Sequence, residues 1–160
     1  FTDELTGLAN RKRWQSQLAQ ELGNTLSPDC RAVVLFDLDH FKQINDHFGH
    51  LVGDQVIASV SQVIRELSYS SCQHGRLGGE EFAVLLPNTS VFAAEDICER
   101  IRLAIMQTDY STLAAGLHIT VSMGIAGFAG ETQHDKLLSR SDSALYRAKQ
   151  SGRNRIDIAV

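Results

Sequence analysis

The five consecutive apolar residues Ala32–Phe36 constrain the fold of this chain more than any other feature. An uninterrupted apolar run of this length is typical of a strand that is covered on both faces, so we place it in the middle of a sheet. Asp37 and Asp39 follow directly and would emerge at the carboxyl edge of that strand. Carboxylates beside a buried core need a physical reason, and they therefore indicate a functional site.

Apolar residues at helical spacing and alternating segments surround this strand. They predict helices over 11–22, 41–48, 56–67, 91–108 and 136–150, and further strands over 74–77, 82–86, 117–125 and 155–158. Asn10 and the segment 88–90 offer helix caps, Gly23 is expected to end the first helix in a left-handed conformation, and Ser27-Pro28 marks a turn. From 31 to 127 the order is β-α-β-β-α-β, the split β-α-β arrangement with helices on one face of an antiparallel sheet. We therefore predict an α+β, ferredoxin-like fold whose central sheet is mainly antiparallel.

Composition limits the class of protein. The 160 residues, 43% of them hydrophobic, fit a single compact domain over 1–160 and exclude a disordered chain. Because the net charge is −4 and no apolar run could span a bilayer, we expect no nucleic acid partner and no direct membrane contact. The three cysteines form no CxxC pair, and the start of the chain resembles no signal peptide. The absence of an initial Met leads us to expect a domain of a longer protein.

A second acidic motif is Gly78-Gly79-Glu80-Glu81, between two predicted strands. Its glycines are typical of a tight hairpin turn. If this hairpin neighbours the central strand, three or four carboxylates, counting Asp37 and Asp39, would meet at one edge of the sheet. Such a group requires a divalent cation, and hard oxygen ligands favour Mg²⁺ or Mn²⁺. The alternative is that the aspartates cap a turn and the glutamates are merely exposed.

Cationic residues complement this edge. The helix that begins at Phe41 offers backbone N–H groups, and Lys42 in its first turn could hold phosphate oxygens. Lys149 and Arg153 lie four residues apart at the end of the last helix, where cations also simply complement a helix dipole. A zinc site formed by His40, His47 and His50 is a weaker hypothesis than the carboxylate site, because Gly49 should break the helix between the last two histidines. The residues favour metal-assisted phosphoryl or nucleotidyl transfer.

Six segments in order resemble those of one known family. They are DELTGLANR at 3–11, FDLDHFKQIND at 36–46, FGH at 48–50, GD at 53–54, GGEEF at 78–82 and AKQSGRN at 148–154. Together they resemble the GGDEF domain, the catalytic module of bacterial diguanylate cyclases, over almost the whole chain. The resemblance implies a five-stranded fold like the adenylyl cyclase palm and an enzyme that condenses two GTP into cyclic di-GMP and two pyrophosphates.

The resemblance also implies roles for individual residues. The side chains of Asp37 and Glu80 and the backbone carbonyl of Leu38 would bind Mg²⁺, and Glu80 would accept the proton of the attacking hydroxyl. Asn45 and Asp54, with His50 nearby, would contact guanine. Phosphates would be held at Phe41, Lys42, Lys149 and Arg153. The active site would form between two protomers. The resemblance further implies an upstream sensory or regulatory domain in the parent protein and a cytoplasmic location for this domain.

One departure from the family pattern concerns inhibition. Many relatives carry an inhibitory product site, RxxD, whose Arg lies nine residues before the signature, but here that window contains Tyr69 and Cys72 in the two charged positions. We therefore expect no feedback inhibition through this site. The main alternative function is a catalytically inactive module that binds GTP or another protein. A weaker alternative is a cyclase or polymerase-like enzyme for another nucleotide, which activity with ATP would reveal.

Overall fold

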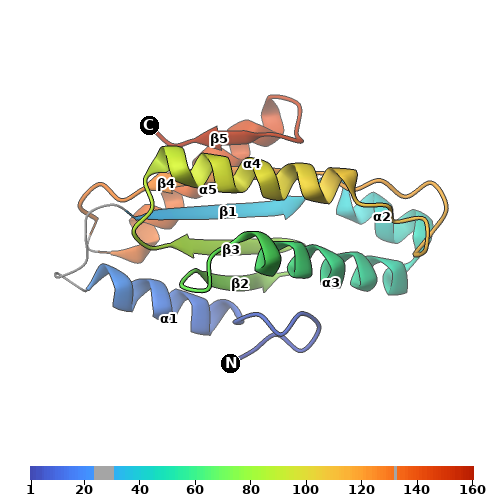
Figure 1. Ribbon diagram of the computed structural model, residues 1–160, viewed down its shortest axis with the longest axis horizontal. Helices are drawn as coiled ribbons and strands as arrows, with labels where there is room; N and C mark the ends of the chain where they lie inside the picture. The colour runs from blue at the N-terminus through green and yellow to red at the C-terminus, as the bar shows by residue number, and fades with distance from the viewer. Residues whose placement is uncertain (24–30, 132) are drawn as a thin grey trace.

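The computed structural model describes residues 1–23, 31–131 and 133–160. At its centre is a five-stranded sheet with the spatial order β2-β3-β1-β4-β5 (Figure 1). The strands are β1 (Ala32–Leu38), β2 (Gln73–Gly78), β3 (Glu81–Leu86), β4 (Val121–Gly127) and β5 (Ile156–Ile158). All neighbours pair antiparallel except β4 and β5, which are parallel. The predicted α+β fold with a mainly antiparallel sheet is confirmed.

The apolar run forms the central strand, as predicted. Every residue of β1 is buried, and Phe36 stacks on Phe82 of β3 with 5.4 Å between ring centroids. Because side chains alternate along a strand, the two faces of β1 contribute to two different hydrophobic clusters. Val34 and Phe36 belong to one of them, while Val33 and Leu35 belong to the other. A strand with two apolar faces therefore requires helices on both sides of the sheet.

Five helices supply these two layers: α1 (Arg11–Leu22), α2 (Phe41–Phe48), α3 (His50–Leu67), α4 (Val91–Gln107) and α5 (His134–Gln150). The buried residues of α3 and α4 share the cluster of Val34, and those of α1 and α5 share the cluster of Val33. Figure 1 shows α3 and α4 in front of the sheet and α2 beyond the carboxyl end of β1. The helices of the split β-α-β centre thus cover one face, and α1 and α5 cover the other.

Helix ends follow the predicted signals with two exceptions, the end of α1 and the start of α3, which begins at His50 rather than at 56 because Gly49 is its N-cap residue. The side chains of Asn10 and Ser90 accept hydrogen bonds from the backbone N–H groups of Arg13 and Ala93, which confirms both caps. Gly49, with φ +92°, separates α2 from α3 as predicted. Gly23 has φ −77°, so the expected left-handed end of α1 was wrong. The predicted Ser27-Pro28 turn lies outside the described residues.

Strand β4 differs from its prediction in both position and burial. Alternation predicted a strand over 117–125 with one covered face, but β4 spans Val121–Gly127 and is buried on both faces through Ala126. The second face is covered because α5 packs directly on Gly124, where an added Cβ would lie 2.3 Å from the backbone oxygen of Ser141. The Ser141 hydroxyl donates to the carbonyl of Gly124 and accepts the N–H of Leu35. These bonds fix the position of α5 relative to β1 and β4.

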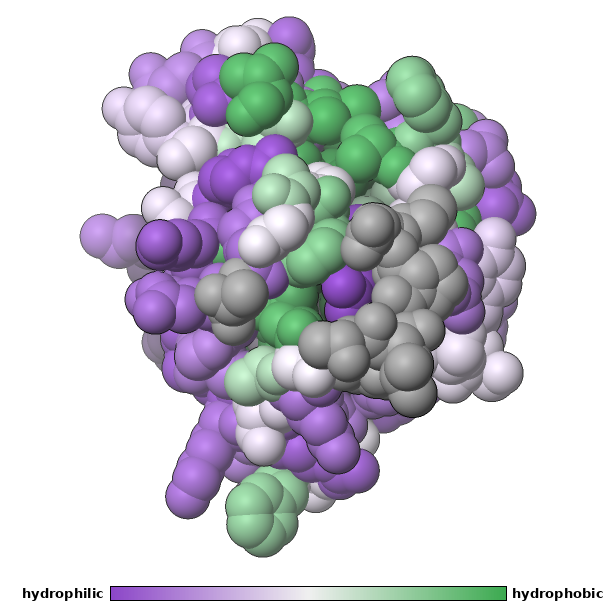
Figure 2. Space-filling model, turned by 90° about the vertical axis from the view of Figure 1, so that its left-hand side faces the viewer, coloured by the Kyte–Doolittle hydropathy of each residue, from purple (hydrophilic) through white to green (hydrophobic). Residues whose placement is uncertain are grey.

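The surface carries hydrophobic side chains in several places. None of the helices in the described ranges is long and apolar enough to cross a membrane. Large exposed hydrophobic residues include Leu51, Phe92 and Tyr146, which come from three different helices. Figure 2 shows hydrophilic and hydrophobic side chains intermixed on the face at the left of Figure 1. The carboxyl end of β1, where the sequence places the functional site, lies toward the opposite end of the molecule (Figure 1).

Candidate active site

A pocket of about 290 Å³ opens at the carboxyl end of β1. Its walls come from the end of β1, the start of α2, the β2–β3 turn and the end of α5. Seven of the predicted site residues line it: Asp37, Leu38, Phe41, Lys42, Glu80, Lys149 and Arg153. The fold therefore brings together residues that are more than 100 positions apart in the sequence.

Asp37 is the acidic centre of this pocket and is only 5% exposed. Its Oδ2 lies 2.5 Å from Nζ of Lys149, whereas its Oδ1 is buried and has no hydrogen-bond partner in the described part of the chain. Burial raises the pKa of the Asp37 carboxyl, while the hydrogen bond and charge of Lys149 lower it and the nearby charges of Glu80 and Glu81 raise it. Because the carboxylate is costly to bury, a second cation at Oδ1 would be stabilising.

Glu80 reaches this pocket because the hairpin turns tightly. Gly78 and Gly79 adopt φ values of +151° and +45°, which favour glycine. The carbonyl of Glu80 accepts the N–H of Leu38 at 3.3 Å and so ties the turn to the end of β1. The acids of the two motifs, Asp37 and Glu80, therefore line one pocket, as the sequence predicted.

Asp39 does not join this pair as an available metal ligand. It lines the pocket, but its carboxylate accepts hydrogen bonds from Thr120, Ser122 and the backbone of Asn154. Three carboxylates, those of Asp37, Asp39 and Glu80, therefore meet at this edge of the sheet as predicted, but that of Asp39 is already engaged by protein donors. In the described ranges no three His, Cys, Asp or Glu side chains gather as a metal site, so the histidine alternative gains no support either.

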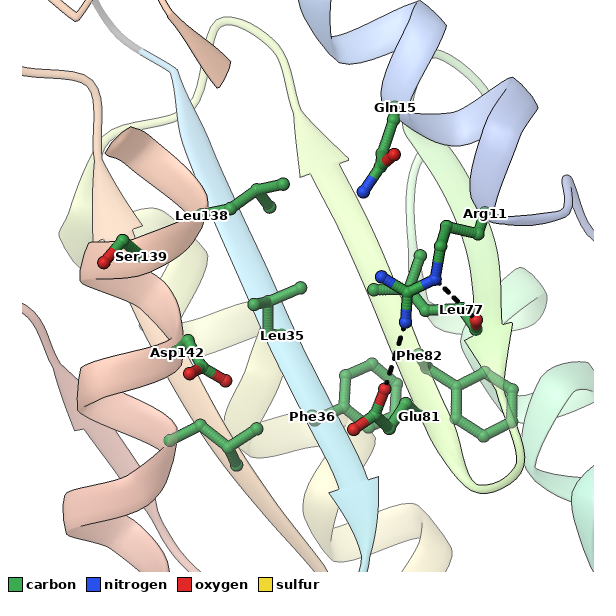
Figure 3. A pocket seen from close by; sticks show the side chains of 11 residues that line it. Arg11, Gln15, Leu35, Phe36, Leu77, Glu81, Phe82, Leu138, Ser139 and Asp142 are labelled. Carbon is green, nitrogen blue, oxygen red and sulfur yellow. Dashed lines mark hydrogen bonds and ion pairs between the residues drawn. The ribbon is translucent and has the colours of Figure 1, made fainter. Parts of the chain in front are cut away.

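Glu81 faces a second hollow, which lies over β1 and β3 between α1 and α5 and measures about 330 Å³. Figure 3 shows the guanidinium of Arg11 bonded to the carboxylate of Glu81 and to the carbonyl of Leu77. Glu81 stands opposite Asp37 in the β1–β3 register, yet its partner is Arg11 at 3.4 Å. The two adjacent glutamates of the GGEEF segment therefore lie in different pockets, and only Glu80 lines the pocket of Asp37.

The pocket suits a divalent cation despite having only two suitable carboxylates. The buried Oδ1 of Asp37 has no partner in the described residues, and Glu80 and Leu38 line the same walls. Two carboxylates and a backbone carbonyl are hard oxygen ligands of the kind that Mg²⁺ and Mn²⁺ prefer. The donor set therefore fits the predicted metal.

Positive groups lie around these acids. The N-terminus of α2 forms one wall, and its cap residue His40 makes no side-chain hydrogen bond to the helix, so its first N–H groups remain available to an anion. Lys42 is in this first turn and is exposed. Lys149 does more than complement the dipole of α5, since it pairs with Asp37. Arg153 lines the pocket from the turn after α5.

The three residues predicted to contact guanine lie beside the pocket but do not line it. Asn45 is on α2, and its buried Oδ1 has no hydrogen-bond partner in the described residues. It packs against Gly53 of α3, where an added Cβ would lie 1.9 Å from that oxygen. His50 and Asp54 are exposed in the first turns of α3. Within the described part of the chain, the Asn45 oxygen is thus an unpaired but buried acceptor.

Sequence reasoning missed the residues that surround Asp39. The alternation over 117–125 predicts that Thr120 and Ser122 face solvent, but Ser122 is fully buried and both donate to Asp39. Arg102 of α4 donates to the carbonyl and side-chain oxygens of Asn154. Two hydroxyl residues at alternate positions of an apolar strand were the signal that could have found them. Hydroxyls at such positions are as suited to a buried acceptor as to water.

The N-terminal motif is also connected to the glycine-rich hairpin between β2 and β3. Asp3 accepts hydrogen bonds from Thr6 and pairs with Arg76 of β2 at 3.1 Å. Arg76 in turn donates to the carbonyl of Gly79 in the turn before Glu80. These contacts explain physically why the segment DELTG accompanies the glycine-rich hairpin.

Comparisons with known proteins agree with this geometry. The family model described as "Diguanylate cyclase, GGDEF domain" matches residues 1–155. The chain is 42% identical to diguanylate cyclase DgcP of Pseudomonas aeruginosa over 99% of its own length, and 39% identical to the response regulator PleD of Caulobacter vibrioides over 97%. It spans only 24% of the first relative and 35% of the second.

Solved structures resemble the whole chain. The GGDEF domain of DgcB from Caulobacter crescentus, in complex with c-di-GMP, has a TM-score of 0.91 and 35% identity, and the match covers 98% of this chain and 92% of that one. The active GGEEF domain of a diguanylate cyclase from Vibrio cholerae has a TM-score of 0.86 and 32% identity, with 96% and 98% covered. The match therefore extends over the complete fold of these domains.

Proposed function

Since this chain belongs to the GGDEF domain family of diguanylate cyclases, we propose that it condenses two molecules of GTP into cyclic di-GMP with release of two pyrophosphates. The observation that carries the proposal is the pocket at the end of β1. Asp37, Glu80, Lys149 and Arg153 line it together, and one buried oxygen of Asp37 has no partner in the described residues. The divalent cation of a bound nucleotide would neutralise the carboxylates of this pocket, and the phosphates would neutralise its cationic side chains.

The side chains of Asp37 and Glu80 and the carbonyl of Leu38 would hold Mg²⁺, or Mn²⁺ in its place. When bound, such an ion neutralises charge that develops on a transferring phosphoryl group. Lys149 and Arg153, with Lys42 and the N–H groups at Phe41, would bind and orient the phosphates from the other walls. Lys149 must then exchange part of its contact with Asp37 for the triphosphate.

Glu80 is the residue we assign to the proton of the attacking 3′-hydroxyl. Its carboxylate stands at the rim of the hairpin turn, where a nucleotide bound to a facing protomer could approach. One protomer holds one GTP, so the reaction requires two copies of the domain whose pockets face each other, each delivering its hydroxyl in line. We therefore propose a homodimer as the catalytic form, in a longer protein whose upstream domain regulates its assembly.

Selectivity for guanine would come from Asn45 and Asp54, with His50 nearby. Asn45 and Asp54 form a donor and acceptor pair, because the Asn45 amide can donate as well as accept while the Asp54 carboxylate accepts, and guanine presents N–H donors and the O6 acceptor on its pairing edge. Adenine would leave this donor and acceptor pair unsatisfied, which costs binding free energy in a partly buried site. The buried Oδ1 of Asn45 has no hydrogen-bond partner in the described residues, so a donor reaching it would be stabilising, which supports this assignment. Because GTP is the substrate, we assign the domain to the cytoplasm.

The test compares product formation by the unsubstituted chain and by Glu80→Gln at high protein concentration, with GTP and Mg²⁺. We expect cyclic di-GMP from the unsubstituted chain but not from Glu80→Gln, and none from either when EDTA removes the metal. Glu95→Gln is the matched control, because Glu95 is an exposed acid on α4 away from the pocket. If a covalently enforced dimer binds GTP but yields no product, the domain is a regulatory GTP-binding module instead.

A further inference from the structure

The carboxylate of Asp39 is held by three donors although it is only 5% exposed. The hydroxyl of Thr120 donates to Oδ2 at 2.7 Å, and the hydroxyl of Ser122 donates to Oδ1 at 2.6 Å. The third donor is the backbone N–H of Asn154, at 3.0 Å from Oδ2. Thr120 directly precedes β4 and Ser122 lies within it, so Asp39 links the end of β1 and the start of β4 to the turn after α5.

That turn has an unfavourable backbone conformation. After α5 ends at Gln150, Gly152, Arg153 and Asn154 adopt φ values of +120°, +64° and +47°. Glycine adopts such values readily and asparagine more often than other residues, but two successive side-chain-bearing residues in this region persist only where surrounding contacts hold them.

Contacts hold the turn from two directions. Asp39 accepts the N–H of Asn154, and Nη1 of Arg102 donates to the side-chain oxygen of Asn154 at 2.8 Å and to its carbonyl at 3.3 Å. The N–H of Arg153 also donates to the carbonyl of Ala148 at 3.0 Å, which ties the turn to the last residues of α5. Of these contacts, the bond to Asp39 is the one that joins the turn to the wall of the pocket.

We propose that Asp39 is a positioning residue, whose carboxylate fixes the left-handed turn so that Arg153 points its charge at the phosphates of a bound nucleotide. The inference rests on the proposed function, because it takes the ligand of the pocket to be a nucleoside triphosphate. Asp37, two residues earlier, contributes to the cation side, while Asp39 sets the geometry of the phosphate side. The two aspartates of the motif therefore have separate tasks.

Two substitutions at position 39 separate this role from that of a metal ligand. Asp39→Ala removes the acceptor and leaves the N–H of Asn154 without its partner. Asp39→Asn removes the charge but keeps an oxygen for Thr120 and Asn154, while its amide nitrogen can donate to Ser122, whose hydroxyl rotates to accept. A positioning role predicts that the amide restores function, whereas a role that needs negative charge predicts that it does not.

The first measurement is the calorimetric affinity for a non-hydrolysable GTP analogue with Mg²⁺, and for guanosine, which lacks phosphates. We expect Asp39→Ala to weaken analogue binding about tenfold, the usual size for one charge-assisted contact. Guanosine binding and the affinity of Asp39→Asn should stay close to those of the unsubstituted chain. In an Arg153→Ala background, Asp39→Ala should cause no further loss. An equal loss in Asp39→Asn and Asp39→Ala, or an additive loss with Arg153→Ala, would overturn the inference.

The second measurement follows the turn itself through amide hydrogen exchange at Asn154, read by NMR without any ligand. This amide should be protected in the unsubstituted chain and in Asp39→Asn, and exchange faster in Asp39→Ala. If Asp39→Ala fails to fold, the double variant Thr120→Val with Ser122→Ala replaces it. This variant keeps the carboxylate but removes its two hydroxyl donors, so the Asn154 amide should exchange moderately faster than in the unsubstituted chain. An exchange rate at Asn154 that is the same in the variant as in the unsubstituted chain would refute the inference that Asp39 fixes the turn. Failure of the unsubstituted chain to bind the GTP analogue would instead refute the proposed function.

Discussion

Nζ of Lys149 lies 2.5 Å from Oδ2 of Asp37, so the last turn of α5 meets the carboxyl end of β1. The Asp37 side chain is 7% exposed and that of Lys149 is 33% exposed, which means that the acid is buried and the cation reaches in from the rim. The contact depends on how α5 sits on the sheet, since Ser141 two turns earlier bonds both Leu35 and Gly124. A cation thus stands beside the carboxylate before any ligand enters.

Replacing Lys149 by Met should destabilise the fold by about 1–2 kcal/mol, because a buried carboxylate loses its charged partner while the rim remains partly solvated. Asp37→Asn in the same background should recover most of that loss, since it removes the uncompensated charge. Urea unfolding of both single variants and of the double variant gives the coupling free energy. A coupling near zero would show that the pair contributes nothing to stability.

Gly53→Ala should impair nucleotide binding more than folding. The added methyl would lie 1.9 Å from Oδ1 of Asn45 and 3.1 Å from the ring of Phe41, so the Asn45 side chain must move from its place beside the pocket. We expect about a tenfold weaker affinity for a GTP analogue, and a loss of stability within about 1 kcal/mol. Titration calorimetry and thermal unfolding measure the two effects.

The matched control for this substitution is Gly23→Ala at the end of α1. Gly23 has φ −77°, and an added Cβ there would come no closer than 3.5 Å to the backbone oxygen of Ala19. It should leave nucleotide affinity unchanged. Equal affinities for both variants would mean that Asn45 does not contact the base.

His74 should make the fold less stable in mild acid. Burial, with the charge of Arg65, lowers the pKa of His74 below its ordinary value of 6.5, and Nε2 lies 2.5 Å from the Ser68 hydroxyl. The unfolded chain therefore takes up a proton near pH 6.5 that the folded chain resists. As the pH falls below 6.5, the free energy of unfolding should decrease by at most about 1.4 kcal/mol per pH unit from this group.

His74→Gln keeps a hydrogen-bonding side chain but cannot take up this proton. Denaturant unfolding of both proteins at several pH values should give a shallower decline for the variant below pH 6.5. Parallel curves would place the acid sensitivity on other residues.

Cyclic di-GMP should not inhibit this domain noncompetitively. The two charged positions of the inhibitory RxxD pattern hold Tyr69 and Cys72, and Cys72 is buried, so neither offers the charged contacts that this pattern provides. Initial rates with micromolar product and saturating GTP should match those without product. Inhibition that excess GTP fails to relieve would disprove this expectation and indicate a product site elsewhere on the molecule.

The central sheet and most helix ends could be predicted because their signals are local. The apolar run of β1 demands cover on both faces, and Asn10, Ser90 and Gly49 act on backbone groups within a few residues of themselves. Gly23 was misjudged because a glycine permits a left-handed end without requiring one. Strand β4 was misjudged because its polar positions are covered by α5 and by Asp39, and neither contact is visible in the pattern of the strand.

The sequence by itself determined which residue types would be available: acids after β1 and in the hairpin, and cations at the end of α5. Only the tertiary structure decided how the acids are divided, with Asp37 and Glu80 at the pocket, Glu81 bonded to Arg11, and Asp39 holding the turn of Asn154. The reason is that a carboxylate's role depends on which donors reach it. Those donors come from segments up to 115 residues away, and their positions are fixed only when the layers pack.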